Sequence, residues 1–181
     1  MRSERLFFRE FRDNDFELLY SVFSNEEIME YALMDKVNSE KEFTPYFDKI
    51  LKNNSTIENR SLFEYAVFSN SSREFIGFAD IEIISKNLHG GNAEIGYFLL
   101  PQFWGNGYAT EIAKTLIECC FKDFNLHRVF ARCNANNSKS EKVMKNCGME
   151  REAEFRKVRY KFCRWENELQ YSILKDDWIN Q

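Results

Sequence analysis

The sequence predicts an α/β (α+β) fold: one domain over residues 1–181, built on a mixed, mostly antiparallel sheet of about seven strands with about four helices. The first observation is composition, since 181 residues that are 44% hydrophobic and 16% aromatic suffice for a buried core. The second is a run of strand-like segments leading into residues 92–121, where a strand, a glycine turn and an amphipathic helix succeed one another. The third is a further strand after that helix, which makes a parallel crossover.

The first two elements are a strand over residues 4–11 and a helix through about Phe23. We expect the strand because its large apolar residues alternate with charged ones. The polar run at 12–15 offers the helix an N-cap and an acidic first turn. Residues 24–38 show no clear pattern.

The next helix has two competing starts. Ser39 and Glu42 fit a capping box, yet Pro45 would then lie inside the helix. The alternative is Thr44 as N-cap with Pro45 at the first helical position. Under either start the apolar residues that face inward are Phe47, Ile50 and Leu51.

A hairpin follows. Its strands are expected at 61–68 and 74–84, joined by the polar turn 69–73. A second turn at 86–91 leads to a strand that ends at Pro101, which completes a three-stranded antiparallel meander.

The turn after this meander predicts an anion site. Gly105 and Gly107 let the backbone bend and approach a ligand closely, and the first turn of the next helix leaves N–H groups without internal partners. A plain structural turn is the alternative. The helix itself is supported by an apolar stripe at helical spacing, formed by Ala109, Ile112, Ala113, Leu116, Ile117, Cys120 and Phe121.

The C-terminal part completes the sheet. Asn137 or Ser138 can cap a helix there, with Ser138 and Glu141 as a capping box and Gly148 as its C-terminal stop. The remaining strands are expected at residues 128–133, 150–160 and 166–174.

Composition and charge exclude several classes of protein. The net charge of −4 gives no basic face of the kind that nucleic-acid binders carry. The sequence has no apolar run long enough for a membrane span, and its charged N-terminus does not resemble a secretory signal, so we expect a cytoplasmic protein with no nucleic-acid or membrane partner. Five cysteines without a CxxC pair suit reduced thiols, and His89 and His127 lack metal-spaced partners, so no metal site is expected.

The glycine turn does not fit two common phosphate-binding motifs. A P-loop needs Lys and then Ser or Thr after its last glycine, whereas Gly107 is followed by Tyr108 and Ala109. A dinucleotide fingerprint needs three glycines in the first strand–helix unit, and this turn has two, past the middle of the chain.

The pattern Gln-x-x-Gly-x-Gly at residues 102–107 resembles the acyl-CoA pyrophosphate loop of the GNAT superfamily of N-acetyltransferases. The segments 94–99, 104–111 and 125–129 are similar to the RimJ/RimL branch of that superfamily, whose named members acetylate protein N-termini. The block 137–149 is similar to the Asn-x-x-Ser…Gly-Phe element of the same branch.

This resemblance implies the GNAT fold, with parallel strands 4 and 5 splayed to bind acyl-CoA, and acetyl-CoA as the acyl donor. Backbone N–H groups from Trp104 to Ala109 would hold the pyrophosphate with Tyr108 and Thr110 in contact, although packing across the loop explains Trp104 and Tyr108 equally well. The backbone of residues 98–100 would pair with the pantetheine arm, with the N–H of Leu99 or Leu100 facing the thioester oxygen. The implied donor-binding residues are Phe98, Leu99, Leu100, Gln102, Trp104, Gly105, Asn106, Gly107, Tyr108, Ala109, Thr110, Asn137 and Ser140.

Acetyl transfer also needs a proton for the leaving thiolate. Ser140 matches a family position that donates this proton in some members, while Met144 stands where many others have a tyrosine and cannot donate. The alternative is that Ser140 bonds a free N–H in the first helical turn, and Asn137 is likewise either an N-cap or a pantetheine contact. Three lysines either reach the nucleotide phosphates or are solvated: Lys139, Lys142 and Lys145.

The predicted base is Glu94, at the start of the strand that would meet the donor. Asp80 and Glu82 lie on one face of a neighbouring strand, and an exposed strand face explains all three carboxylates equally well. The amine can also arrive neutral by desolvation, without a dedicated base.

We therefore expect an enzyme that transfers acetyl from acetyl-CoA to a primary amine by direct attack in a ternary complex. A covalent acyl-enzyme is not expected, because Cys133 and Cys147 have no obvious histidine partner. The acceptor is a protein N-terminus or a small amine or antibiotic, and the protein is a monomer or homodimer. Met144 leaves open a non-catalytic acyl-CoA-binding module.

The acceptor pocket is expected to come from segments 24–60 and 152–166. These segments are aromatic and acidic in places, which suits a cation and equally an ordinary surface; the residues are Glu26, Glu27, Tyr31 and Asp35.

Overall fold

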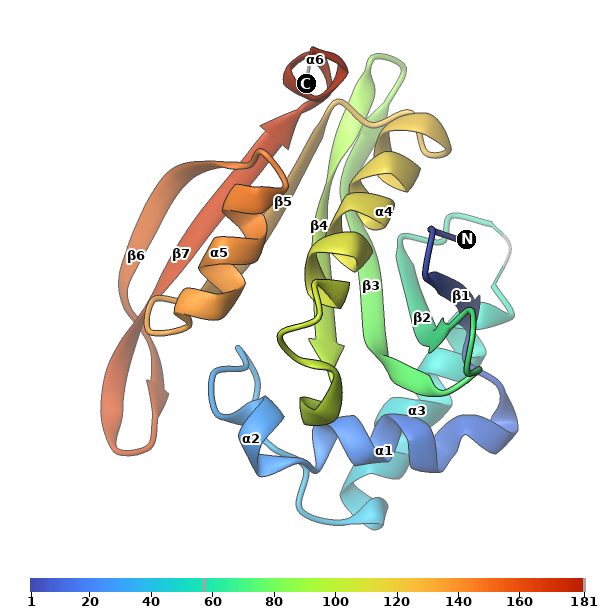
Figure 1. The fold of residues 1–181 in the computed structure, drawn as a ribbon. Coiled ribbons are helices and arrows are strands. Elements are labelled where there is room, and N and C mark those ends of the chain that lie inside the picture. The colour runs from blue at the N-terminus through green and yellow to red at the C-terminus, as the bar shows by residue number, and fades with distance from the viewer. Residues whose placement is uncertain (57, 181) are drawn as a thin grey trace.

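The computed structural model describes residues 1–56 and 58–180 and contains a seven-stranded sheet in the order β1-β2-β3-β4-β5-β7-β6 (Figure 1). Neighbouring strands are antiparallel except β4 and β5, which are parallel. The mixed, mostly antiparallel sheet is therefore confirmed. The strands are β1 Leu6–Glu10, β2 Leu62–Ser69, β3 Phe75–Asn87, β4 Gly90–Leu99, β5 Arg128–Asn134, β6 Glu150–Lys161 and β7 Arg164–Leu174.

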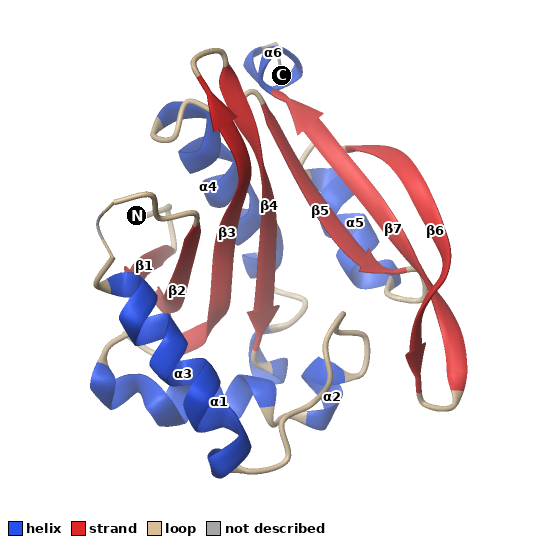
Figure 2. Ribbon diagram, turned by 180° about the vertical axis from the view of Figure 1, so that it is seen from behind, coloured by secondary structure: helices blue, strands red, loops and turns tan. Residues whose placement is uncertain are grey.

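Helices cover both faces of the sheet (Figures 1 and 2). Helices α1 and α3 pack on β2 and β3, whereas α4 and α5 pack on the opposite face against β4 and β5. Among the described residues, no helix combines the length and the apolar character that crossing a bilayer requires. The α-helices are α1 Phe16–Phe23, α2 Glu26–Met29, α3 Glu40–Asn54, α4 Tyr108–Lys122, α5 Ser138–Asn146 and α6 Lys175–Ile179, with 3-10 turns at Asp13–Asp15 and Pro101–Phe103.

The described residues form six α-helices, where about four were expected, because no sequence pattern indicated the short helices α2 and α6. These helices have four and five residues. Fewer than two turns leave too few positions for a periodic apolar pattern to be recognised.

The parallel strands β4 and β5 separate soon after they meet. They pair only at Asn92 with Arg128, Ala93 with Val129 and Glu94 with Phe130. Beyond these pairs β4 continues beside β3, while β5 stays beside β7 as far as Asn134 (Figure 2). The sheet therefore opens between the two strands, as the expected splay requires.

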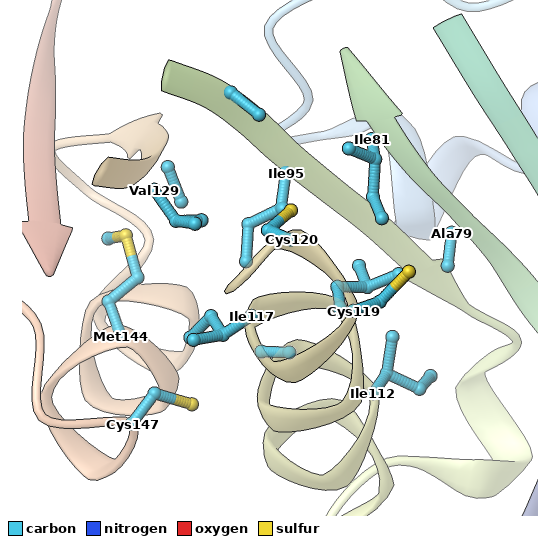
Figure 3. Close-up of a cluster of buried hydrophobic side chains, with 14 of the residues drawn as sticks. Ala79, Ile81, Ile95, Ile112, Ile117, Cys119, Cys120, Val129, Met144 and Cys147 are labelled. Atoms are coloured by element: carbon cyan, nitrogen blue, oxygen red, sulfur yellow. The ribbon is translucent and has the colours of Figure 1, made fainter. Parts of the chain in front are cut away.

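Two buried clusters lie on opposite faces of the sheet. On one face, Ile112 and Ile117 of α4 form one buried cluster with Ile81 and Ile95 of the sheet and Met144 of α5 (Figure 3). On the other face a phenylalanine-rich cluster lies under α1 and α3. Because strand side chains alternate, even-numbered residues of β3 and β4 near the opening face α1 and α3.

The start of α3 resolves the two competing predictions. Ser39 is the N-cap, and its Oγ accepts a hydrogen bond from the Glu42 N–H at 3.2 Å. Pro45 lies inside the helix, so the alternative start at Thr44 is wrong. Thr44 caps no helix; its Oγ1 donates a hydrogen bond to the Glu40 carbonyl at 2.8 Å.

Helix α5 is capped by Asn137, whose Oδ1 accepts from the Ser140 N–H at 3.0 Å. The predicted capping box of Ser138 and Glu141 is wrong, because the Glu141 carboxylate accepts from the Tyr171 hydroxyl at 2.6 Å. Gly148 follows the helix with a φ of 75°, which confirms it as the stop.

A buried lysine ties the β6–β7 hairpin to the segment after α2. The Nζ of Lys161 donates to the carbonyls of Met29, Ala32 and Met34 at 2.6, 3.1 and 3.0 Å. Burial lowers the pKa of Lys161, and the nearby negative charges of Asp35 and Glu166 oppose that shift. This contact fixes residues 29–34, which had no readable pattern in the sequence.

We expect Lys161→Ala to lower the free energy of unfolding by about 1–3 kcal/mol, because buried carbonyls lose their donor. Urea denaturation measures this loss. Arg156→Ala, an exposed site on the same strand, is the matched control and should stay near the wild-type value. Equal stability of the two variants would contradict the anchoring role.

Candidate active site

The glycine loop exposes the first turn of α4. Gly105 and Gly107 have φ angles of 77° and 78°, in the region that favours glycine, and Gly107 is the N-cap without a side-chain bond to the helix. A Cβ placed on Gly105 would meet no atom within 4 Å, so that side of the loop is open. Free N–H groups in front of an open loop fit a diphosphate.

Arg5 braces this loop, a contact that the sequence analysis missed. Its Nη1 donates to the Asn106 carbonyl at 2.9 Å, and its Nε donates to Glu111 Oε2 at 2.6 Å. The guanidinium also lies over the Tyr108 ring, 4.5 Å from its centroid. Arg5 lies about a hundred residues from its partners, and no local pattern links such positions.

The two aromatic residues of the loop have structural partners. Trp104 Nε1 donates to the Leu99 carbonyl at 2.8 Å, and the Lys139 ammonium lies 4.7 Å from the centroid of the Trp104 ring. Tyr108 packs edge to face on Phe103. Packing therefore accounts for both side chains, and both also line the cleft described next.

One cleft of about 1330 Å³ is lined from both faces of the sheet at the opening between β4 and β5. Toward α4 and α5 it is lined by the glycine loop, Asn137 and Ser140. Toward α1 and α3 it is lined by Tyr46, Asp80 and Glu94. A cleft of this size admits a drug-sized ligand or larger.

Most of the predicted donor-binding residues meet in this cleft, and three do not. Gln102, Asn106 and Leu100 lie outside its lining. The Leu100 N–H already donates to the Ile76 carbonyl of β3 at 3.0 Å. Of the two N–H groups expected to face the thioester oxygen, only that of Leu99 is therefore available. In an antiparallel pair, alternate residues direct their N–H groups to opposite sides, so the Leu99 N–H is aimed at the opening. The predicted residues on the lining are Phe98, Leu99, Trp104, Gly105, Gly107, Tyr108, Ala109, Thr110, Asn137 and Ser140.

Ser140 has a hydroxyl partner that sequence reasoning missed. The Tyr97 hydroxyl and Ser140 Oγ are 3.2 Å apart, one on β4 and the other in the first turn of α5. Burial raises the pKa of Tyr97, and the Ser140 contact opposes this, so Tyr97 is a neutral donor at neutral pH. Met144 is buried in the core and offers no proton.

The cysteines next to the cleft are inert thiols. Cys133 and Cys147 are buried. Burial raises the pKa of Cys133 to about 12 and that of Cys147 to about 11. Since the thiolate is the nucleophile, neither residue is prepared for covalent catalysis.

Carboxylates line the side of the cleft that faces α3. Glu94 is held by Arg132, whose Nε and Nη2 donate to its two oxygens at 2.8 and 3.0 Å. Glu64 accepts from the Tyr46 hydroxyl at 3.1 Å. Asp80 lies between them on β3, where burial and neighbouring carboxylates raise its pKa to about 8.

The segments expected to form the acceptor pocket contribute in part. Glu27 and Tyr31 line the cleft, whereas Glu26 and Asp35 line a separate hollow beside the β6–β7 hairpin. The described residues of segment 152–166 lie outside the cleft lining. Of the three lysines, Lys139 and Lys142 line the cleft, and Lys145 pairs with Glu141 at 2.8 Å.

Comparison with protein families decides the assignment. The model of the family described as an acetyltransferase (GNAT) domain matches residues 5–150. The chain belongs to this GNAT family. It is also similar to the uncharacterized N-acetyltransferase YnaD of Bacillus subtilis, with 32% identity over 176 residues that cover 97% of each chain. The protein is therefore an acetyl-CoA-dependent N-acetyltransferase, while the RimJ/RimL branch stays a prediction.

Solved GNAT structures share the fold. A GNAT-family acetyltransferase from Bacillus anthracis has a TM-score of 0.78 at 26% identity, covering 97% of this chain and 98% of that one. A spermidine N-acetyltransferase from Vibrio cholerae, in complex with CoA and spermine, has a TM-score of 0.84 at 19% identity, covering 98% of this chain and all of that one. At this identity the second similarity concerns the fold alone.

We expect Gly107→Val to weaken coenzyme A binding at least about tenfold, because a β-branched residue is strained at this φ and the loop must shift. Isothermal titration calorimetry with coenzyme A measures the change. Gly90→Val is the control, because Gly90 also has a positive φ of 117° but is the first residue of β4, outside the glycine loop. The control should lose stability and keep its affinity; a loss of affinity in both variants would contradict a specific role of the loop.

Proposed function

We propose that the protein transfers acetyl from acetyl-CoA to a primary amine by direct attack in a ternary complex, with the two substrates on opposite faces of the sheet. The observation that carries this proposal is the cleft lined from both faces where β4 and β5 separate. The donor would lie against α4 and α5, and the amine would approach from the side of α1 and α3. Because both meet at the opening, no enzyme-bound acetyl group is needed.

Acetyl-CoA supplies the thioester carbonyl that the amine attacks. On the protein side, the open N-terminus of α4 binds the diphosphate, and the N–H of Leu99 stabilises the developing oxyanion. Lys139 and Lys142, at the same side of the cleft, add positive charge near the phosphates.

The leaving thiolate would take its proton from Ser140, with Tyr97 as the second hydroxyl of the pair. Their separation of 3.2 Å lets either one donate to the other, so a proton lost by Ser140 can be replaced by Tyr97. This pair supplies the function that Met144 cannot. The rival interpretation, a binding module without chemistry, loses the argument that rested on Met144.

Glu94 remains the base predicted from the sequence. It lines the cleft at the point where β4 and β5 begin to part. Its two carboxylate oxygens, however, already accept hydrogen bonds from the Arg132 guanidinium.

The proposed acceptor is a cationic primary amine. The acidic wall of the cleft favours positive charge, and the related fold of the Vibrio cholerae enzyme binds spermine, which supports a small amine. The similarity to the RimJ/RimL branch supports a protein N-terminus as the second candidate. The buried, unpaired thiols fit the cytoplasmic location expected from the sequence.

Mass spectrometry tests this function directly. Purified protein is incubated with acetyl-CoA and a panel of aliphatic polyamines, aminoglycosides and peptides with free N-termini. A gain of one acetyl group on one class identifies the acceptor. Coenzyme A binding without turnover across the panel would instead establish the binding module.

We expect Ser140→Ala and Tyr97→Phe each to lower kcat about 100-fold at saturating acetyl-CoA, because the thiolate then leaves without a positioned proton donor. Affinity for coenzyme A should stay within a factor of about three, which calorimetry measures. Tyr65→Phe, a buried tyrosine on β2, is the matched control and should keep the wild-type kcat. Unchanged kcat in both test variants would rule the pair out.

A further inference from the structure

Asp80 occupies a notch that Gly96 leaves open beside the gap between β4 and β5. The two residues face each other across β3 and β4, and a Cβ on Gly96 would lie 2.3 Å from Asp80 Oδ1. No other side chain could stand at position 96 with the carboxylate in this place. The neighbours of Gly96 on β4 are Ile95 and Tyr97, which line the cleft at the opening.

The two flanking carboxylates have partners, and Asp80 has none among the described residues. Glu64 accepts from Tyr46 and Glu94 accepts from Arg132. The influences on Asp80 are burial and the charges of nearby carboxylates, with no hydrogen bond among them. Once ionised, a carboxylate only accepts hydrogen bonds, so Asp80, which has no donor of its own, is open to one from a ligand.

The charged and titratable groups around Asp80 come from every element that borders the cleft there. Two of these groups are cations, and each interacts with a carboxylate other than Asp80. The positive charge of Lys49 attracts Glu64, and Arg132 forms an ion pair with Glu94. Helix α2 adds Glu27 to the opposite wall. The groups nearest to Asp80 are Glu64 on β2, Glu82 on β3, Glu94 on β4, Tyr46 and Lys49 on α3, and Arg132 on β5.

We propose that Asp80 binds the ammonium group of the acceptor and takes its proton, so that Asp80 rather than Glu94 is the catalytic base of this enzyme. The inference rests on the proposed function, because it needs an amine on the α3 side of the opening. Gly96 is then a positioning residue that gives the carboxylate a direct path to the amine.

The raised pKa suits this task. A carboxyl group at its ordinary value of about 4 accepts a proton poorly from an alkylammonium ion, whose pKa is about 10. Asp80, with a pKa raised to about 8, lies much closer to the amine. The same negative neighbours that raise the pKa of Asp80 also attract the cation.

The protons balance over the reaction. Asp80 takes the first proton from the ammonium ion and later releases it to solvent. The neutral nitrogen forms a bond to the thioester carbon, and the carbon–sulfur bond breaks. The sulfur takes a proton from Ser140, and the second nitrogen proton, lost as the amide forms, restores the Ser140–Tyr97 pair through solvent. The products are therefore the amide, the free thiol and the one proton that Asp80 releases.

The test compares Asp80→Asn with Glu94→Gln and the wild type, using the acceptor found by mass spectrometry. Asp48→Asn, an exposed aspartate on α3 outside the cleft lining, is the control for the chemical change. We expect Asp80→Asn to lower kcat by about 100-fold or more while coenzyme A affinity stays unchanged. Its stability should not fall, because the substitution removes a partly buried ionisable group that has no hydrogen-bond partner.

The pH profile separates a base from a merely structural residue. In the wild type, kcat should rise through about pH 8 and level off as Asp80 loses its proton. In Asp80→Asn the rise of kcat near pH 8 should disappear, and kcat should instead keep rising toward the pKa of the free amine, about 10. Glu94→Gln should keep the wild-type limb.

Three results would overturn the inference. The first is an Asp80→Asn profile with the wild-type limb, and the second is a change in acceptor KM alone. The third needs no turnover: carbon-13 NMR of labelled aspartate carboxyls, assigned by the resonance missing in Asp80→Asn, would show Asp80 titrating near its ordinary value of about 4. A wild-type protein that acetylates no amine would refute the proposed function and the inference with it, whereas the NMR result would refute the inference alone.

Discussion

The early separation of β4 from β5 is the constraint on which the site depends. Three residue pairs hold the strands together, and the next residues of each strand bond only to their other neighbour. A continuous sheet would have used the Leu99 N–H in a ladder and would have closed the passage between the two faces. The unpaired backbone edge of β4 is therefore open to a ligand, which would supply the hydrogen-bond partners that this edge lacks.

Both sides of this opening are prepared by ordinary secondary-structure rules. On one side, a positive φ at Gly107 starts α4 without a capping side chain, which keeps its first N–H groups free. On the other side, strand alternation brings Asp80 and Glu94 to the same face as the phenylalanine cluster under α1 and α3. The open N-terminus of α4 and the acidic wall thus line the same cleft.

Sequence patterns predicted the features that local rules control. The apolar stripe of α4, the glycine loop, the hairpin turn and the stop at Gly148 each depend on neighbouring residues, and each is present. The contacts of Arg5 with Asn106 and of Tyr97 with Ser140 join distant parts of the chain, and no spacing rule announces such pairs. The same reason explains why the sequence alone gives no ground for choosing between Glu94 and Asp80 as the base: neither the pairing of Glu94 with Arg132 nor the notch at Gly96 is visible before the strands are placed.

The anchoring of residues 29–34 by Lys161 has a consequence for how acceptor choice can change. The donor side is built from β4, α4 and α5, whereas one wall of the acceptor side is positioned by the tip of the β6–β7 hairpin. Variation in that hairpin can reshape the entrance for the amine while the nucleotide end keeps its geometry. The architecture thereby separates the part that recognises a common metabolite from the part that can diverge toward new amines.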